Sequence, residues 1–414
     1  MTLLPLLSLL TGTPAAATGP DALVQAALAA HPSLSALQAR VHALEAAALA
    51  AGTWKDPMVG LEVSNLPLWS LGLGDHAMAG VQLKVQQTLP APGTSAADRQ
   101  AADLRAATAT HRVAEARDAL AAEIALAWWE LTLSRQLQRV TSAHLTRTEE
   151  LLEAVTARYE VGGAGQHAVV HLEVLRDRLR DDVVDFDARQ AVLTAALVAA
   201  TQGAATLPVA TPAEVDVAPV TGTAVAWLDQ ARQARPELAR LEAEARAAQA
   251  AAEAAALGVR PDPTVWLGYR LRTFPDDPRD LVTVGVSVPI PKGSRTRADA
   301  MEAMHAATAT AARQTLDARL LTLGAQLAAA EARWSRAAQK AGTYADSLLP
   351  AAAAALETTL ADYAVGRATF ASLYEAEVTL LGLERAWRTA VIDTWRAATQ
   401  VEALIGAPAT GATP

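Results

Sequence analysis

A long stretch without glycine or proline, from Thr94 to Val161, constrains this chain more than any other feature. Alanine is the dominant residue of the chain, and it loses no side-chain entropy on entering a helix, so we expect one continuous helix here. At about 1.5 Å per residue, that helix would run roughly 100 Å. A globular domain in a chain of 414 residues cannot bury so long a rod, which predicts antiparallel helical hairpins.

Internal self-similarity predicts two copies of one structural unit. The first copy is expected over 21–203 and the second over 224–407, joined by a linker at 204–223 and followed by a tail at 408–414. Four landmarks recur in the same order at a nearly constant offset. The pairs are His31-Pro32 and Arg235-Pro236, Asp56-Pro57 and Asp262-Pro263, Leu89-Pro90 and Val288-Pro289, and Tyr159-x-x-Gly162 and Tyr363-x-x-Gly366.

Each copy is predicted to contain a helix, two strands, a very long helix and a return helix. Gly324, Gly342 and Pro350 fall within the second long helix, which should therefore bend or break, above all near Pro350. Glycines that tolerate positive φ follow Tyr159 and Tyr363, where the chain turns back. The helices are expected at about 33–51, 95–160 and 166–202, and at about 237–257, 295–363 and 367–405.

The four predicted strands alternate apolar and polar residues with a period of two; they are expected at about 58–64, 81–89, 264–272 and 281–289. Two interpretations fit this alternation: a soluble, half-buried sheet, or a membrane barrel with lipid outside and water inside. The long helices favour the barrel, because nothing else in the chain could cover the apolar face of a soluble sheet. Trp54, Trp69, Trp266 and Tyr269 lie near strand ends, as an interfacial aromatic belt requires.

Strands in lipid would also require several copies of the chain. Open sheet edges leave backbone groups unpaired in hydrocarbon, so four strands cannot insert alone. Two copies give eight strands, whose interior side chains fill, whereas three copies give twelve strands and a water-filled bore. We therefore expect a trimer of mainly α-helical protomers, each contributing four strands.

Composition argues against several other functions. The net charge of -9 and the lack of a basic stripe disfavour a nucleic-acid partner. The absence of cysteine excludes disulfides, thiolate zinc sites, cysteine nucleophiles and a lipidated N-terminal cysteine. Because no Ser-His-Asp arrangement, Walker loop or GxGxxG motif occurs in a strand–turn–helix context, we expect neither an enzyme nor a bound cofactor.

Residues 1–20 are interpreted as a signal peptide or, alternatively, as a disordered tail. They contain the apolar run Leu3–Leu10, followed by small residues at Pro14-Ala15-Ala16-Ala17 that suit a cleavage site. The basic segment that usually begins a signal peptide is missing, since the first basic residue is Arg40.

The order of helix, hairpin, long helix, Tyr-x-x-Gly turn and return helix, present twice, resembles the TolC family of outer-membrane efflux proteins. The likeness covers essentially all of residues 21–407. The stretch from Asp56-Pro57-Met58 to Asn65-Leu66-Pro67, followed by Gln86-Gln87-Thr88-Leu89-Pro90, resembles most the CusC/CzcC-like heavy-metal branch.

That resemblance implies a homotrimer with a twelve-stranded barrel in the outer-membrane lipid and a helical tunnel in the periplasm. It implies partners as well: a periplasmic membrane-fusion adaptor and an inner-membrane RND-type pump, with heavy-metal cations as the cargo. Adaptor docking would fall at the turns of Tyr159, Gly162, Tyr363 and Gly366. Carboxylates often ring the periplasmic aperture in this family, but the matching positions here are Ala168, His171, Ser372 and Glu375.

Two groups of residues are weak metal candidates. His167 and His171 are spaced i, i+4 on one helix face, but no third ligand is evident, and polar residues at a helix tip explain them as well. Met301, Met304 and His305 also share a face and would suit Cu(I), although methionine at helical spacing is more often core packing. The alternative function for the whole chain is a soluble periplasmic coiled-coil scaffold or adaptor.

Overall fold

The computed structural model describes residues 19–203, 209–272, 279–290 and 292–408. Most of the predicted signal peptide or tail at 1–20, the first five residues of the linker and most of the tail at 408–414 lie outside these ranges. The chain divides into two compact units: unit 1 comprises 1–35, 114–235 and 320–414, and unit 2 comprises 36–113 and 236–319. Each unit contains segments of both sequence repeats, so the compact units do not correspond to the repeats.

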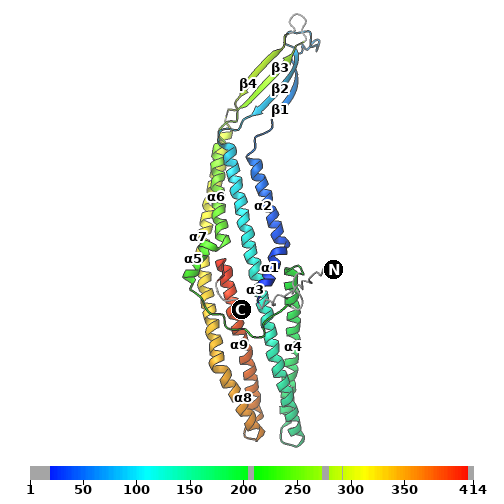
Figure 1. Cartoon of the computed structure of the whole chain (residues 1–414), viewed down its shortest axis with the longest axis vertical. Coiled ribbons are helices and arrows are strands. Elements are labelled where there is room, and N and C mark those ends of the chain that lie inside the picture. Colours follow the sequence, from blue (N-terminus) through cyan, green and yellow to red (C-terminus); the bar gives the residue numbers. More distant parts are fainter. Residues whose placement is uncertain (1–18, 204–208, 273–278, 291, 409–414) are drawn as a thin grey trace, which may run out of the picture. The chain divides into compact units, whose positions relative to one another are not determined.

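Unit 2 contains a four-stranded antiparallel sheet with the order β1-β2-β3-β4 (Figure 1). Its strands are β1 (Met58–Ser64), β2 (Gly80–Thr88), β3 (Thr264–Leu271) and β4 (Leu281–Ser287). The helices of this unit are α6 (Pro236–Leu257), most of α2 (Pro32–Ala51), and the first parts of α3 (Thr94–Glu160) and α7 (Ser294–Thr343). Small side chains let helices α3 and α6 approach closely, through Ala101, Ala250 and Ala251.

Unit 1 is helical. It contains α1 (Asp21–Ala30), α4 (Gln166–Ala200), α5 (Ala224–Ala234), α8 (Leu349–Ala364) and α9 (Phe370–Ile405), together with the second parts of α3 and α7. Its interior is built around fully buried tryptophans, among them Trp128, Trp129 and Trp334. The sequence-based expectation of a mainly helical chain with four strands is confirmed.

Two short helices were missed from the sequence, α1 and α5. Each is separated from a proline by one residue, His31 or Arg235, which takes an extended backbone conformation. A proline disfavours the helical region for the residue before it, so the chain bends there and a second helix starts at the proline. The sequence predicts the first helix of each copy only from about residues 33 and 237 onward, so α1 and α5 are additional to it.

The linker between the repeats is held tightly to unit 1 over its described part, 209–223. Three indole N–H groups from three helices donate hydrogen bonds to its carbonyl oxygens: Trp128 to Ala210, Trp334 to Ala218 and Trp395 to Asp216, at 2.7 to 3.2 Å. Ala218 is fully buried. This segment is a structural strap, although its Pro, Thr and Val content suggested only a connection.

The predicted break in the second long helix is a short π-helix, Tyr344–Leu348 (η1), between α7 and α8. Pro350 follows two residues later and has no N–H to donate to the preceding turn, which accounts for the irregular hydrogen bonding at this point. Within the described ranges, no helix is both long enough and apolar enough to cross a membrane.

Candidate functional site

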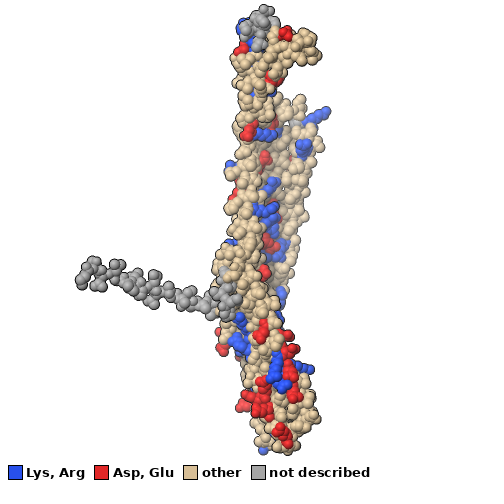
Figure 2. All heavy atoms as spheres, turned by 90° about the vertical axis from the view of Figure 1, so that its right-hand side faces the viewer, with Lys and Arg blue, Asp and Glu red and all other residues tan. Residues whose placement is uncertain are grey.

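One face of the sheet is apolar and exposed. The strand register places Val59 opposite Val85, Val85 opposite Leu267, and Leu267 opposite Val284, so one apolar row crosses all four strands. These four side chains remain 42% to 77% exposed. A neighbouring row contains Leu61, Leu83, Tyr269 and Val282, which are also exposed. In Figure 2 most of the visible surface at the upper end is tan, with a few acidic and basic side chains among it. The apolar face of this sheet is therefore not the buried side of a soluble core.

The opposite face carries the polar residues, and they lie flat against the sheet. Arg270 donates a hydrogen bond from Nη2 to Oε1 of Gln82 at 2.8 Å, and Gln82 is buried although its side chain is polar. The Lys84 ammonium lies 5.0 Å from the centre of the Trp266 ring. A Cβ on Gly285 would come within 2.3 Å of Trp266, so glycine is required for that ring to lie on its neighbour. The sheet is thus apolar on one face and polar on the other.

This placement changes the expected aromatic belt. Trp266 belongs to the polar face, beside Lys84, and cannot be part of a belt on the apolar face. Trp54 and Trp69, which flank β1 in the sequence, are both exposed, and Tyr269 lies in an apolar row. Trp54, Trp69 and Tyr269 are therefore exposed, as the belt requires, whereas Trp266 lies on the polar face.

The sheet has two edge strands, β1 and β4. Within the described chain, β1 is paired only with β2, and β4 is paired only with β3. Their outer N–H and C=O groups have no strand partner among the described residues. Because β1 and β4 run in opposite directions, β4 of one copy and β1 of the next could continue the same antiparallel order.

The two Tyr-x-x-Gly turns have the same local geometry. Gly162 has a φ of +77° and its N–H bonds to the carbonyl of Tyr159 at 2.9 Å. Gly366 has a φ of +76° and bonds to the carbonyl of Tyr363 at 3.1 Å. A Cβ on either glycine would meet no atom within 4 Å, so it is the positive φ that calls for glycine.

The two turns lie against each other in unit 1 (Figure 1). Arg158 donates to the carbonyl of Tyr363 at 2.8 Å, and its guanidinium lies 4.7 Å from the centre of the Tyr363 ring. Beside each glycine an apolar side chain projects into solvent: Val161 is 82% exposed and Val365 is 68% exposed. The structure therefore brings the two turns together through Arg158 and leaves Val161 and Val365 exposed beside them.

The four expected aperture residues are not brought together as a group. Ala168 is buried with Val155 and Leu172. Ser372 belongs to the start of α9, where its backbone N–H donates to the Thr369 hydroxyl. Glu375 is exposed on α9, and the exposed His171 packs its ring at 5.7 Å from Tyr374.

The weak metal candidates lie in surroundings that do not favour a metal. The His167 and His171 rings pack near Phe370, at 6.2 and 6.4 Å between centroids. Met301 and Met304 are exposed, and His305 lines a cavity of about 560 Å³ in unit 2 together with Arg40, Arg105 and Arg112, whose charges oppose a cation. Among the residues the structure describes, no three His, Cys, Asp or Glu side chains come together in a way that could hold a metal ion.

A buried ionic cluster joins α3 to α9 in unit 1, and sequence reasoning missed it. His144 and Glu377 each have side chains only 2% exposed, and Nδ1 of His144 lies 2.5 Å from Oε1 of Glu377. Nε2 of His144 lies 3.2 Å from Glu384, and Arg147 lies 3.4 Å from the other Glu377 oxygen.

Both ring nitrogens of His144 therefore face carboxylate oxygens, an arrangement in which both must donate. Burial by itself lowers the pKa of His144, but the bonds to Glu377 and Glu384 outweigh it, and the pKa is raised. The bond to His144 in turn lowers the pKa of Glu384. The cluster therefore favours an imidazolium between two carboxylates.

Comparison with solved structures finds close matches to the whole chain. The outer membrane protein VceC of Vibrio cholerae matches with a TM-score of 0.77 and 18% identity, over 94% of this chain and 97% of that one. The open state of the MtrE outer membrane channel of Neisseria gonorrhoeae matches with a TM-score of 0.75 and 15% identity, over 94% and 89%. CusC matches with a TM-score of 0.74 and 15% identity, over 94% and 92%.

No protein-family model matches the sequence, and neither does any curated protein. At identities of 15% to 18%, the similarity to solved structures establishes the fold. The resemblance predicted from the repeated order of elements is confirmed at that level. The chain has the fold of the TolC-like outer-membrane channels.

Proposed function

We propose that the chain is one protomer of a trimeric channel in the outer membrane, which serves as the passive exit duct of an efflux pump. The observation that carries this proposal is the sheet: its apolar face is exposed and its two edges are unpaired. Fully burying one Val or Leu side chain is worth about 1.5–3 kcal/mol. Two rows of such residues across four strands therefore favour a lipid environment strongly.

The unpaired edges support assembly from several copies. In hydrocarbon, the outer backbone groups of β1 and β4 must find partners, and copies of the same sheet supply them in the required antiparallel order. Three copies give twelve strands, which leave a water-filled bore, whereas eight strands are filled by their own side chains. The polar face with Lys84 and Arg270 would then line that bore.

The helical part would lie in the periplasm, and the paired turns would be its tips. The exposed valines at positions 161 and 365 and the Arg158 contact give these turns a firm apolar surface on which a periplasmic adaptor could dock. The adaptor would link the duct to an inner-membrane RND-type pump. His171, Ser372 and Glu375 would lie near the aperture, whereas the buried Ala168 would support it from behind.

Heavy-metal cations are the cargo that the resemblance to the CusC-like branch suggests. CusC is among the structures with the same fold, but so are channels whose similarity to this chain is equally high. A metal cargo would be tested by comparing the sensitivity of a deletion strain to copper, silver, zinc and cobalt salts. Unchanged sensitivity to all four would remove the metal proposal and leave the channel proposal intact.

The channel proposal is tested by fractionating cells and running the membrane extract on a gel with and without heating. A heat-sensitive band at about three times the mass of the 43.1 kDa chain, found in the outer-membrane fraction, is expected. The alternative, a soluble periplasmic scaffold or adaptor, predicts a monomer that needs no detergent. The open apolar face of the sheet disfavours that alternative.

A further inference from the structure

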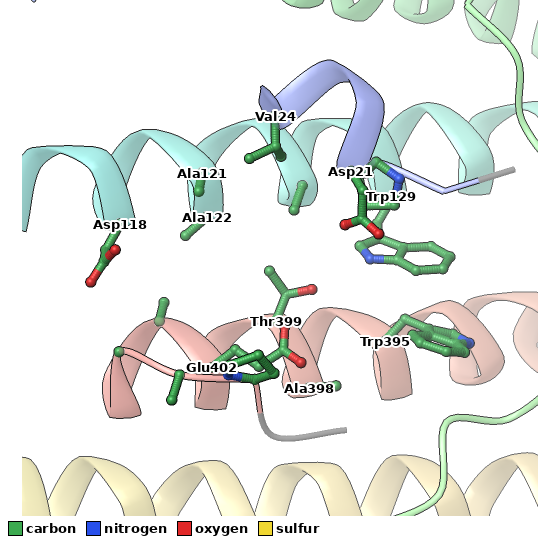
Figure 3. Close-up of a pocket in the computed structure, with 16 residues that line it drawn as sticks. Asp21, Val24, Asp118, Ala121, Ala122, Trp129, Trp395, Ala398, Thr399 and Glu402 are labelled. Atoms are coloured by element: carbon green, nitrogen blue, oxygen red, sulfur yellow. The ribbon is translucent and has the colours of Figure 1, made fainter. Parts of the chain in front are cut away.

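A cavity of about 520 Å³ lies within unit 1, between α1, α3 and α9. Figure 3 shows side chains from the three helices facing the same space: Asp21 from α1, Asp118 and Trp129 from α3, and Trp395 and Glu402 from α9. The remaining walls are mostly alanine. A space of this size, largely apolar with a few polar groups, is typical of sites for small organic molecules.

The aromatic wall of this cavity is rigid. The rings of Trp129 and Trp395 stack at 5.0 Å between centroids with an angle of 19° between their planes. Trp129 is also fixed by an edge contact with Trp128, and Trp395 is fixed by its hydrogen bond to the carbonyl of Asp216. Both rings are more than nine-tenths buried, so they need no rearrangement to receive a ligand.

All the charged side chains that line the cavity are acidic: Asp21, Asp118 and Glu402. Within the described chain, Asp118 accepts no hydrogen bond and forms no ion pair. Burial raises its pKa, against the opposing effect of Arg235 and Arg117. Arg235 is committed elsewhere, because its Nη1 donates to the carbonyls of Ala403 and Leu404 near the end of α9. A partly desolvated carboxylate thus faces the cavity, and no described side chain makes a direct hydrogen bond or ion pair with it.

We propose that this cavity binds a hydrophobic organic cation, with its charge near Asp118 and its apolar body against the alanines and the tryptophan wall. The carboxylates favour a positive charge, and the alanines and the edges of the tryptophan wall provide apolar contact. A bare metal ion is a poor occupant, because hard cations take six or more oxygen ligands and most of the lining here is apolar.

The test uses two probes of the same shape and opposite charge. Tetraphenylphosphonium and tetraphenylborate are titrated by equilibrium dialysis against the purified full chain in nanodiscs of zwitterionic lipid. Binding of the phosphonium is expected to saturate at one site per chain, to weaken with added salt, and to exceed binding of the borate. Both probes also enter lipid, so the uptake by empty nanodiscs is measured in parallel and subtracted. The corrected value reports binding to the chain itself and is independent of whether the sheet forms a channel.

Matched variants locate the site. Asp118→Asn keeps the size of the side chain and removes its charge, and we expect it to weaken phosphonium binding about fivefold or more. Glu153→Gln, which removes an exposed carboxylate elsewhere on α3, should leave the affinity unchanged. Equal affinity in wild type and Asp118→Asn, equal loss in both variants, or borate binding as tight as the phosphonium would each overturn the proposal.

Discussion

The buried cluster around His144 gives the sharpest test of the packing between α3 and α9. Replacing His144 with leucine removes both hydrogen bonds to the carboxylates but keeps a side chain of comparable size. Glu377 would then remain almost fully buried, with Arg147 at 3.4 Å as its remaining charged partner. We expect α3 and α9 to lose local stability around His144 and Glu377.

The size of the stability loss is set by the Glu377 carboxylate, which stays buried without its histidine partner. Breaking a buried ion pair by removing one partner typically costs about 3–5 kcal/mol, because the other charge is left uncompensated. Arg147 is 40% exposed and can follow Glu377, so we expect the lower end, about 3 kcal/mol. At about 1.4 kcal/mol per tenfold change, this is on the order of a hundredfold rise in local opening. The double variant His144→Leu/Glu377→Leu removes both charges and should recover most of the loss.

Hydrogen exchange of backbone amides measures this local opening without requiring the whole assembly to unfold. Amides of 140–152 and 374–384 should exchange faster in His144→Leu, while those of α6, which belongs to unit 2, should not change. His42→Leu is the control, because His42 forms an exposed pair with Glu45 that is worth less than about 1 kcal/mol. Unchanged exchange in His144→Leu, or a double variant that exchanges as fast as the single one, would refute the reasoning.

Four further predictions follow from the cluster, the sheet and the turns. The pKa of His144 is raised in the folded state, so its contribution to stability is full below the unfolded pKa of 6.5 and is lost as pH rises through the folded pKa. The pKa of Glu384 is lowered, so its contribution to stability is full above the unfolded pKa of 4.5 and is lost as pH falls through the folded pKa. Protection of 140–152 should therefore be greatest between these values and lose this dependence in His144→Leu. Val284→Asp should impair membrane assembly, at a cost below the roughly 2–4 kcal/mol of an Arg or Lys at the bilayer midplane, whereas Thr283→Asp on the opposite face should be tolerated; equal trimer yields on an unheated gel would contradict this. Gly366→Ala should destabilise the turn by about 1 kcal/mol, because its φ of +76° is unfavourable for alanine, and should reduce efflux. Gly382→Ala within α9 is the control and should be neutral or stabilising; equal drug or metal resistance in the two strains would count against a role for the turn. Arg158→Gln should loosen the two turns against each other, seen as faster exchange at 363–367, and no change there would show that the contact is incidental.

Much of the fold of this chain could be predicted from local sequence patterns. The period of two in the strand sequences and the Tyr-x-x-Gly turns depend on neighbouring residues, and they can be identified without knowing what lies across the chain. The break near Pro350 follows from the missing N–H of proline in the same way. The two extra helices α1 and α5 were overlooked because Pro32 and Pro236 were taken as starts, although a proline also indicates the end of the segment before it.

Contacts between distant residues could not be predicted in this way. His144 and Glu377 are separated by more than half of the chain, and neither stands out in its own helix. The strap at 209–223 depends on indole groups from three different helices, and nothing in its own sequence indicates them. The cavity at Asp118 likewise needs α1, α3 and α9 to be in place, so neither its carboxylates nor its stacked tryptophans could be grouped from the sequence.

The most direct test of the central claim is the environment of the two faces of β4 in membranes. The chain contains no cysteine, so single cysteines at positions 282, 283, 284, 286 and 287 can each carry a spin label without a background signal, while Gly285 stays in place beside Trp266. Labels at 282, 284 and 286 should be reached by oxygen and shielded from a water-soluble nickel chelate, and labels at 283 and 287 should show the reverse. Access of the nickel chelate to both sets alike would place both faces in water and contradict a lipid-facing sheet.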